Sequence, residues 1–337
     1  MTPAPSTPFV ACATRALVAL ACAGTIASAG AAGPLEKTEC IAPAKPGGGF
    51  DLTCKLAQTA LMQSKAIADP MRVTYMPGGI GAVAYNAVIA QRPAEANTIV
   101  AFSGGSLLNL AQGKFGRYNE KDVRWLSVVG ADFGAVIVAE GSPFKSLADV
   151  VAAVKADPTK VVFGAGGTVG SQDWMKAALT ARAAGLNPKS MRFVAFEGGG
   201  EAITALQGGH VQVYSGDASE AAQQIKAGAK IRVLAVMADK RLVGDLASVP
   251  TAKEQGMDIE WPIVRGFYMG PKVGDADFKA WSEAFRKVMA TPEYATLRAE
   301  RGLFPFDLVG DEANAYVQKR VAFYRTLAKD FGLKVAN

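Results

Sequence analysis

Few residues in this chain have the types and spacing that catalysis needs. His210 is the only histidine, and its Gly-Gly-His-Val setting is typical of a turn before a strand. The sequence contains no G-x-S-x-G nucleophile elbow, no H-E-x-x-H or C-x-x-C zinc motif, and no G-x-x-x-x-G-K-[ST] phosphate loop. We therefore predict that the protein is not an enzyme and that it has no catalytic residues, no metal site and no cofactor.

Backbone N–H groups in glycine-rich loops are the chemistry that remains. Four glycine-rich loops lie at residues 47–51, 103–106, 166–171 and 198–200, and the first three also contain small hydroxyls or an acid. Each loop leads into a predicted helix, whose free N–H groups and positive dipole end attract anions. One such loop is explained equally well as a tight turn that binds nothing. Several of them at strand ends predict a shared site for a small polyanion.

The elements that position these loops alternate along the chain. Short β-branched or aromatic runs at 72–76, 98–102, 160–163 and 192–196 each lead into a glycine-rich turn and then a helix. This alternation is typical of an α/β fold with a parallel sheet covered by helices, in which ligands bind at the carboxyl ends of the strands. At the first loop, Asp51 is predicted to be the N-cap of the helix that follows.

The chain is expected to cross between two lobes at two places. Strands at 125–130 and 135–139 are predicted to lead into a second lobe, and an extended segment at 261–269, broken by Pro262 and Gly266, is predicted to lead back. The chain has 337 residues, half of them hydrophobic, which is enough to bury two cores. The predicted domains are a signal peptide at 1–32, lobe 1 at 33–134 and 262–337, and lobe 2 at 135–261.

The N-terminus has the features of an export signal. Arg15 precedes an apolar run at 16–23, and A-x-A cleavage sites follow at 27–29 and 29–31. We predict a cleaved signal peptide and a periplasmic protein, with a lipid anchor at Cys22 as a minor alternative. Removing the one basic residue of this segment lowers the formal net charge from +6 to +5. No dense Lys/Arg run occurs, so a nucleic-acid partner is not expected.

Two cysteines, Cys40 and Cys54, lie outside the predicted signal peptide and flank the first glycine loop. In an oxidising periplasm they are natural partners, and a strand followed by a returning helix can bring such positions together. We predict a disulfide that braces the loop from both sides. The alternative is a pair of buried thiols.

A rival motif lies in the second half of the chain. The glycines of the loop between Gly164 and Gly170 follow a strand and precede a helix, and Glu197 ends the next strand, where a dinucleotide site has its ribose-binding acid. The last glycine comes one position late for G-x-G-x-x-G, and export argues against a diffusible nicotinamide cofactor. An NAD(P)-dependent oxidoreductase is therefore kept only as an alternative.

Four motifs of the chain resemble those of the periplasmic receptors of tripartite tricarboxylate transporters, the Bug/TctC family. A P-G-G-x-x-D pattern lies at 46–51 and a P-G-x-x-G-x-x-A pattern at 77–84. A second-lobe loop that is similar to the family's G-x-G-x-G-[ST] loop lies at 166–171, and an F-x-G-x-x-x-A element at 196–202. The resemblance covers nearly the whole chain after the signal, in order.

The resemblance implies a two-lobed type II periplasmic binding protein fold with the ligand in the cleft between the lobes. It implies a carboxylate ligand held by the first loop and by the loop at 168–171. The segment 40–54 most resembles the tricarboxylate branch, which favours citrate-like acids. The candidate ligand-binding residues are Gly48, Gly49, Phe50, Asp51, Ser103, Gly104, Gly167, Thr168, Gly170, Ser171, Phe196, Glu197 and Asp217.

Some roles stay open at this point. Phe50 either lines the pocket or covers the start of the helix. Asp217 or Glu197 would face the amine if the ligand were an amino acid. The resemblance further implies a two-subunit membrane permease as the partner of a monomeric receptor. In some relatives the partner is a sensor kinase, so a receptor that only signals is a further alternative.

Overall fold

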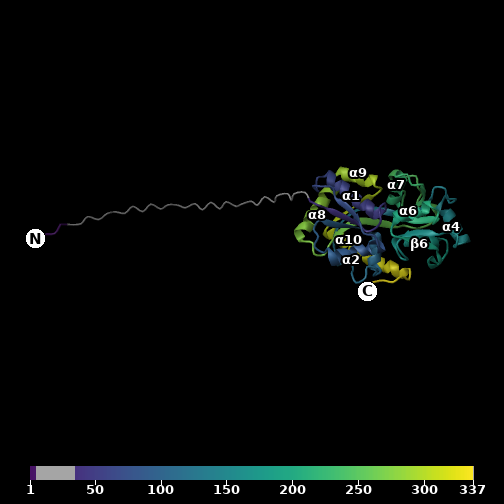
Figure 1. Ribbon diagram of the computed structural model, residues 1–337, viewed down its shortest axis with the longest axis horizontal. Coiled ribbons are helices and arrows are strands. Elements are labelled where there is room, and N and C mark those ends of the chain that lie inside the picture. Colours follow the sequence, from purple (N-terminus) through teal and green to yellow (C-terminus); the bar gives the residue numbers. More distant parts are fainter. Residues whose placement is uncertain (5–34, 337) are drawn as a thin grey trace. The chain divides into compact units, whose positions relative to one another are not determined.

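The computed structural model describes residues 1–4 and 35–336, and the chain divides into two units, Met1–Ala32 and Gly33–Asn337. The predicted signal peptide from residue 5 onward, with Cys22, lies outside the described residues, so that prediction is untested. No helix within the described ranges is both long enough and apolar enough to cross a membrane. Figure 1 shows the elements of the second unit, which is the subject of all that follows.

The strands of this unit form one hydrogen-bonded sheet in two parts. The first part has the order β2-β1-β3-β9-β4 with β10 beside β4, and the second has the order β4-β7-β5-β6 with β8 beside β4. Parallel pairs join β1 to β2 and β3, and β5 to β6 and β7. The strands are β1 (Glu39–Ala42), β2 (Arg72–Tyr75), β3 (Thr98–Ser103), β4 (Arg124–Ala139), β5 (Phe163–Gly166), β6 (Phe193–Phe196), β7 (Val213–Asp217), β8 (Ile231–Met237), β9 (Pro262–Met269) and β10 (Phe304–Val309).

Helices follow the parallel strands, as the alternation in the sequence predicts. In Figure 1, α1, α8 and α9 gather with the first part of the sheet, and α4 and α6 with the second. The helices are α1 (Gly49–Gln63), α2 (Ala82–Gln91), α3 (Gly104–Ala111), α4 (Leu147–Ala156), α5 (Gln172–Ala183), α6 (Gly199–Gln207), α7 (Ala218–Lys226), α8 (Asp275–Met289), α9 (Pro292–Glu300) and α10 (Asp311–Asp330), with short 3₁₀ turns at Gly79–Gly81, Pro188–Ser190, Gly244–Leu246 and Lys253–Gln255.

Strand β4 links the two parts of the sheet and differs from the prediction. The expected pair of strands at 125–130 and 135–139 is one continuous strand of 16 residues. The chain stays extended between the two expected strands because Asp132 and Phe133 pair with the start of β9. From Gly134 onward, the partner strands of β4 are β7 and β8. This change of partners lies beside the predicted lobe boundary, and we keep the predicted lobes as a proposal.

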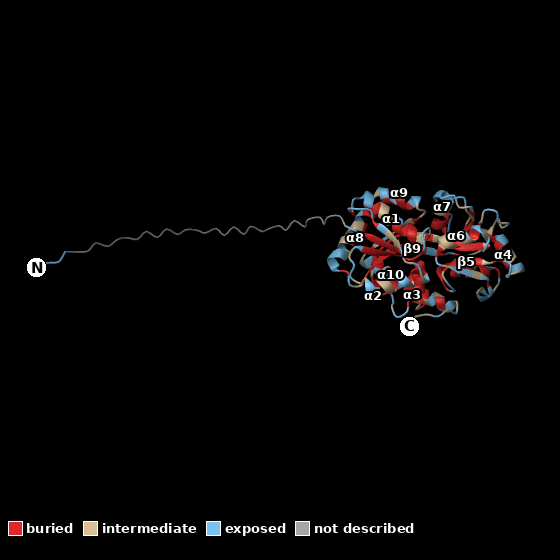
Figure 2. Ribbon diagram, in the orientation of Figure 1, coloured by how far each residue is buried: buried red, intermediate tan, exposed pale blue. Residues whose placement is uncertain are grey.

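Strand β9 returns the chain to the first part without a break. Pro262 is its first residue, where the missing N–H is tolerated. Gly266 continues the strand because it pairs with Phe102 of β3 and with Val128 of β4. The residue is glycine because a Cβ there would lie 2.1 Å from the carbonyl oxygen of Ser127. The predicted interruption at these two residues is therefore wrong. Every residue of β9 after Pro262 is buried, as Figure 2 shows for the centre of the unit.

The start of α1 also differs from the prediction. The N-cap is Gly48, not Asp51, which lies within the first helical turn. Asp51 is buried, and its carboxylate accepts from the N–H of Gly47 at 2.9 Å and from the hydroxyl of Tyr75 at 2.9 Å. Gly47, with a φ of +88°, supplies the turn before the helix, and the helix begins ahead of Asp51, whose carboxylate then closes the loop from within.

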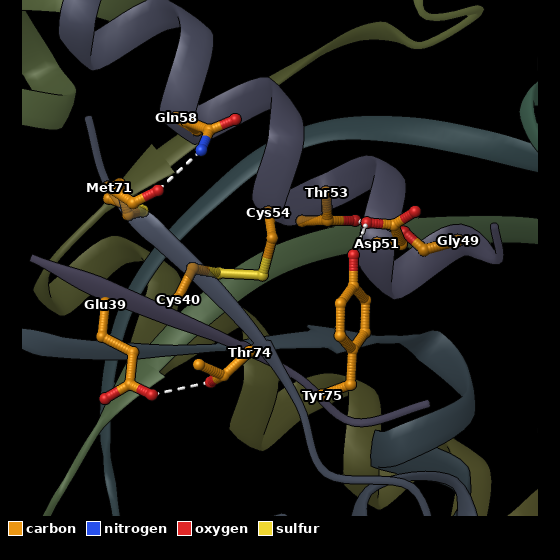
Figure 3. Close-up of a disulfide and its surroundings, with 10 residues drawn as sticks. All are labelled: Glu39, Cys40, Gly49, Asp51, Thr53, Cys54, Gln58, Met71, Thr74 and Tyr75. Carbon is orange, nitrogen blue, oxygen red and sulfur yellow. Dashed lines mark hydrogen bonds between the residues drawn. A yellow bond between two sulfur atoms is a disulfide. The ribbon is translucent and has the colours of Figure 1, made fainter. Parts of the chain in front are cut away.

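The predicted disulfide is confirmed. Cys40 of β1 and Cys54 of α1 are bonded, with their Cα atoms 5.7 Å apart and neither residue exposed. Figure 3 shows the bridge joining the strand to the helix, near the Asp51–Tyr75 hydrogen bond. The chain between the two cysteines is the first glycine loop, so the bridge anchors both of its ends.

Candidate functional site

The first turns of five helices surround a small cavity, which we call the inner cavity. Its volume is about 40 Å³, room for a few water molecules. The helices come from both parts of the sheet. Their contributions to the lining are Gly48, Gly49 and Phe50 from α1 and its N-cap, Ser103 and Gly105 at α3, Gln172 and Asp173 at α5, Gly198 and Gly199 at α6, and Asp217 and Glu220 at α7.

Glycines bring two of these helix starts together. The N-caps of α1 and α6 are Gly48 and Gly198, and neither makes a side-chain capping hydrogen bond. A Cβ on Gly199 would lie 2.1 Å from both carboxyl oxygens of Glu220, and a Cβ on Gly200 would lie 2.7 Å from the carbonyl oxygen of Pro46. The helix starts are thus close-packed, and their combined positive dipole ends favour negative charge in the cavity.

A buried network of charges forms one wall of the inner cavity. Arg265 of β9 is 1 % exposed, and its Nη2 donates to Asp132 at 2.5 Å and to Asp217 at 2.7 Å. Lys176 of α5 is fully buried and pairs with Asp217 at 2.6 Å and with Asp173 at 2.9 Å. Asp217, the N-cap of α7, therefore binds both cations. Through Arg265 and Lys176 the network links α7 to β9, to α5 and, by way of Asp132, to β4.

Arg265 keeps one nitrogen free toward the cavity. Its Nη1 makes no hydrogen bond to any described part of the chain, whereas Nε and Nη2 bind Asp132 and Asp217. A Cβ on Gly49 would lie 2.2 Å from Nη1, so the guanidinium lies directly against the start of α1. A carboxylate bound here would meet a guanidinium N–H and helix N–H groups together.

The network contains more acids than bases. Asp132, Asp173, Asp217 and Glu220 are buried with only Arg265 and Lys176 as cations. Burial raises the pKa of Glu220 well above its usual range, and the charges of Asp217 and Asp173 raise it further. Burial also acts on Asp217, but Lys176 and Arg265 outweigh it and hold the pKa of that carboxyl low. Burial raises the pKa of Asp173 despite Lys176.

The raised pKa of Glu220 predicts how stability depends on pH. A carboxyl whose pKa is higher in the folded state stabilises it below the unfolded pKa of about 4.3 and loses that contribution as pH rises through the folded pKa. Glu220→Gln cannot ionise, so its melting temperature should exceed that of the natural chain at about pH 8 and the advantage should vanish near pH 4. Melting curves across this range check it.

The matched control is Glu312→Gln, an exposed acid in the first turn of α10. Its pH profile should parallel that of the natural chain. Equal profiles for Glu220→Gln and the natural chain would show that the carboxyl of Glu220 is ionised in the folded state despite its neighbours Asp173 and Asp217.

A second, larger cavity shares Ile80 with the inner one, and we call it the outer cavity. Its volume is about 330 Å³, the size of a small-ligand site. Lys114 lines it, and burial lowers the pKa of Lys114 to about 8. The Nζ of Lys114 donates to the carbonyl of Val169 at 2.5 Å, and Nε2 of Gln112 donates to the carbonyl of Gly170 at 2.6 Å. These bonds hold the loop before α5 against α3.

The structure brings nine of the candidate ligand-binding residues to these two cavities. The inner cavity has Gly48, Gly49, Phe50, Ser103 and Asp217, and the outer cavity has Gly167, Thr168, Phe196 and Glu197. The other four line neither cavity. Asp51 closes the first glycine loop, and the Cβ position of Gly104 lies 2.9 Å from the hydroxyl of Tyr324. The carbonyl of Gly170 accepts from Gln112, and Ser171 caps α5 through the N–H of Trp174.

Sequence reasoning missed the charged wall of the inner cavity and the lysine of the outer cavity. Arg265, Lys176, Glu220 and Lys114 were not among the candidates. One signal was available for Arg265, which stands between Val264 and Gly266 in an otherwise apolar strand, where an unpaired cation is costly. The other three stand in helices or turns of mixed polarity, where no local pattern marks them.

The fold is similar to those of solved periplasmic binding proteins. The periplasmic binding protein BugD has the same fold, with a TM-score of 0.77 at 19 % identity, over 89 % of this chain and 99 % of that one. MatC of Rhodopseudomonas palustris, solved with bound malate, has a TM-score of 0.73 at 19 % identity, over 87 % and 99 %. The fold is that of a two-lobed periplasmic binding protein, which confirms the predicted fold class.

The family follows from the sequence. Residues 56–333 match the family described as tripartite tricarboxylate transporter family receptor, TctC, and the chain belongs to it. Over 303 residues it is 25 % identical to the UPF0065 protein in gbd 5'region of Cupriavidus necator, covering 86 % of each chain. Receptors of this family are periplasmic and bind small carboxylates; they are not enzymes, so the oxidoreductase alternative is set aside.

Proposed function

We propose that this chain is an exported periplasmic receptor that captures a small dicarboxylate or tricarboxylate, of citrate type, in the cleft between its lobes. The observation that carries the proposal is the meeting of five helix starts around the inner cavity, with the free Nη1 of Arg265 among them. Such an arrangement offers N–H donors and positive potential to a carboxylate, but no nucleophile or general base.

The outer cavity supplies room and a second cation. Lys114 has N–H groups beyond the one it gives to Val169, and it lines a space large enough for a small organic acid. A ligand that reaches from Lys114 to Arg265 would carry carboxylates at both ends. The malate bound to MatC is a dicarboxylate of the same class.

The partners belong to the same proposal. Family membership supports delivery of the ligand to a two-subunit permease in the membrane, by a receptor that acts as a monomer. The disulfide and the predicted signal at 1–32 support export to the periplasm. A sensor kinase as the receiving partner is the alternative, and it would use the same cleft.

A thermal-shift titration tests the ligand class. A ligand that binds only the folded chain raises the melting temperature. At a ligand concentration of a hundred times its Kd, the free energy of unfolding increases by about 2.7 kcal/mol. We expect a shift with at least one of citrate, tricarballylate, malate, succinate and glutamate, and none with NAD(P). A shift with NAD(P) alone would contradict the proposal, and so would the absence of a shift with all five acids.

A further inference from the structure

Two acceptor atoms on the inner cavity have no hydrogen-bond donor. Glu220 Oε1 and Gln172 Oε1 are buried without a partner in the described part of the chain, and both residues line the cavity. Glu220 is 3 % exposed and Gln172 is 7 % exposed. A buried acceptor without a donor raises the free energy of the state that contains it, so a ligand group that donates there gains affinity.

The neighbours of these two side chains determine which atoms are free. Nε2 of Gln172 donates to Asp217 Oδ1 at 3.1 Å, and turning the amide would put its oxygen against that carboxylate. Oε1 is therefore the atom left unpaired. In Glu220, Oε2 is hydrogen-bonded to the hydroxyl of Tyr214 at 3.2 Å. Its Oε1 lies 3.4 Å from the place that a Cβ would occupy on Gly48, at the start of α1.

The resident cations make no hydrogen bond to either acceptor in the described part of the chain. Lys176 has three N–H groups, which donate to the carbonyl of Gly216 at 2.6 Å, to Asp217 at 2.6 Å and to Asp173 at 2.9 Å. Nε and Nη2 of Arg265 are held by Asp132 and Asp217. The free Nη1 of Arg265 bonds neither acceptor, and the proposed function assigns it to the ligand's carboxylate, so a ligand group is the donor that fits Glu220 and Gln172.

We infer that the ligand carries a hydrogen-bond-donating substituent, a hydroxyl or an ammonium group, beside its carboxylates, and that Glu220 Oε1 and Gln172 Oε1 accept from it. This inference rests on the proposed function and narrows it to hydroxy acids and amino acids. The carboxylate meets Arg265 Nη1 and the start of α1, while the donor meets α5 and α7. The inner cavity, at about 40 Å³, has room for one end of such a ligand, with a carboxylate and the donor substituent next to it.

Ligand pairs that differ only in the donor test the inference. Isothermal titration of the full chain compares citrate with tricarballylate and malate with succinate, which differ by a hydroxyl, and aspartate with succinate, which differ by an ammonium group. In at least one pair the donor-bearing member should bind about 10- to 100-fold more tightly, as expected for a hydrogen bond to a charged or buried acceptor. The pair that shows the preference identifies the source of the donor.

Variants connect the preference to the two acceptors. Glu220→Met and Gln172→Met each remove the acceptor oxygen and keep about the length of the side chain. Each should reduce the ratio of the two dissociation constants by about tenfold. The ratio is insensitive to partial unfolding, because both ligands bind only folded protein. Glu312→Gln, on exposed surface, should leave the ratio unchanged.

The outcomes separate the inference from the proposed function. Equal affinity within every pair would overturn the inference, since a water molecule then serves the two acceptors, while the carboxylate receptor stands. A preference that both variants retain would also overturn it. Failure of all of these acids to bind would overturn the proposed function and the inference with it.

Discussion

Arg265→Met is expected to lower the free energy of unfolding by about 3–5 kcal/mol, the usual cost of breaking a buried ion pair by removing one partner. The methionine fits the space but leaves Asp132 and Asp217 without the guanidinium that both of them bind. Among the described residues, the donors that Asp132 then retains are the N–H and hydroxyl of Ser219 and the N–H of Phe133. Urea denaturation followed by circular dichroism measures the loss.

Controls separate charge from volume in this experiment. Arg286→Met, on an exposed position of α8, should change stability by less than about 0.5 kcal/mol. Adding Asp132→Asn to Arg265→Met should recover part of the loss, because it removes one of the two uncompensated charges. A loss below about 1 kcal/mol for Arg265→Met would mean that the acids find protons or water in its place.

Arg265→Met should also weaken carboxylate binding under conditions in which the variant is still folded. Nη1 is the only guanidinium nitrogen of Arg265 without a partner in the described residues, and it lies against Gly49 at the start of α1. Removing it withdraws a charged donor from the inner cavity, which costs about 1.5–3 kcal/mol of binding, or roughly 10- to 100-fold in Kd. Unchanged affinity would place the ligand's carboxylate elsewhere, with Lys114 as the remaining cation.

Removal of the Cys40–Cys54 disulfide has the next largest expected effect. The bridge spans 14 residues, and closing a loop of that length stabilises a protein by about 3 kcal/mol. The double variant Cys40→Ala, Cys54→Ala should lose that amount in urea denaturation, with a slope that is unchanged or larger, because the unfolded chain without the bridge expands and exposes more surface. The loss should match that caused by reducing the natural chain with dithiothreitol.

The same double variant tests whether the bridge acts on the site. The loop between the cysteines contains Gly48, at the start of α1, and the bridge holds β1 and α1 at its two ends. Without the bridge the loop must be ordered by the ligand, so Kd should rise although no contact to the ligand is removed. A stability loss with unchanged Kd would show that Asp51, through Gly47 and Tyr75, is sufficient to order the loop.

The sequence by itself determined the features that depend on local spacing. The glycine loops before α1, α3, α5 and α6, the alternation of strands and helices, and the pairing of Cys40 with Cys54 all follow from residues close together in the chain. Their signals are local because a turn, a helix start or a short disulfide loop involves few residues. The family resemblance rests on the same motifs and was confirmed.

Only the tertiary structure decided the continuity of β4 and the charged wall of the inner cavity. Residues 131–133 are extended because β9, more than a hundred residues away, pairs with them. Arg265 and Asp132 are 133 positions apart, and Lys176 and Asp217 are 41 apart. Whether such side chains are exposed and solvated or buried and paired depends on how distant elements pack, because burial sets both their pKa values and the strength of their attraction.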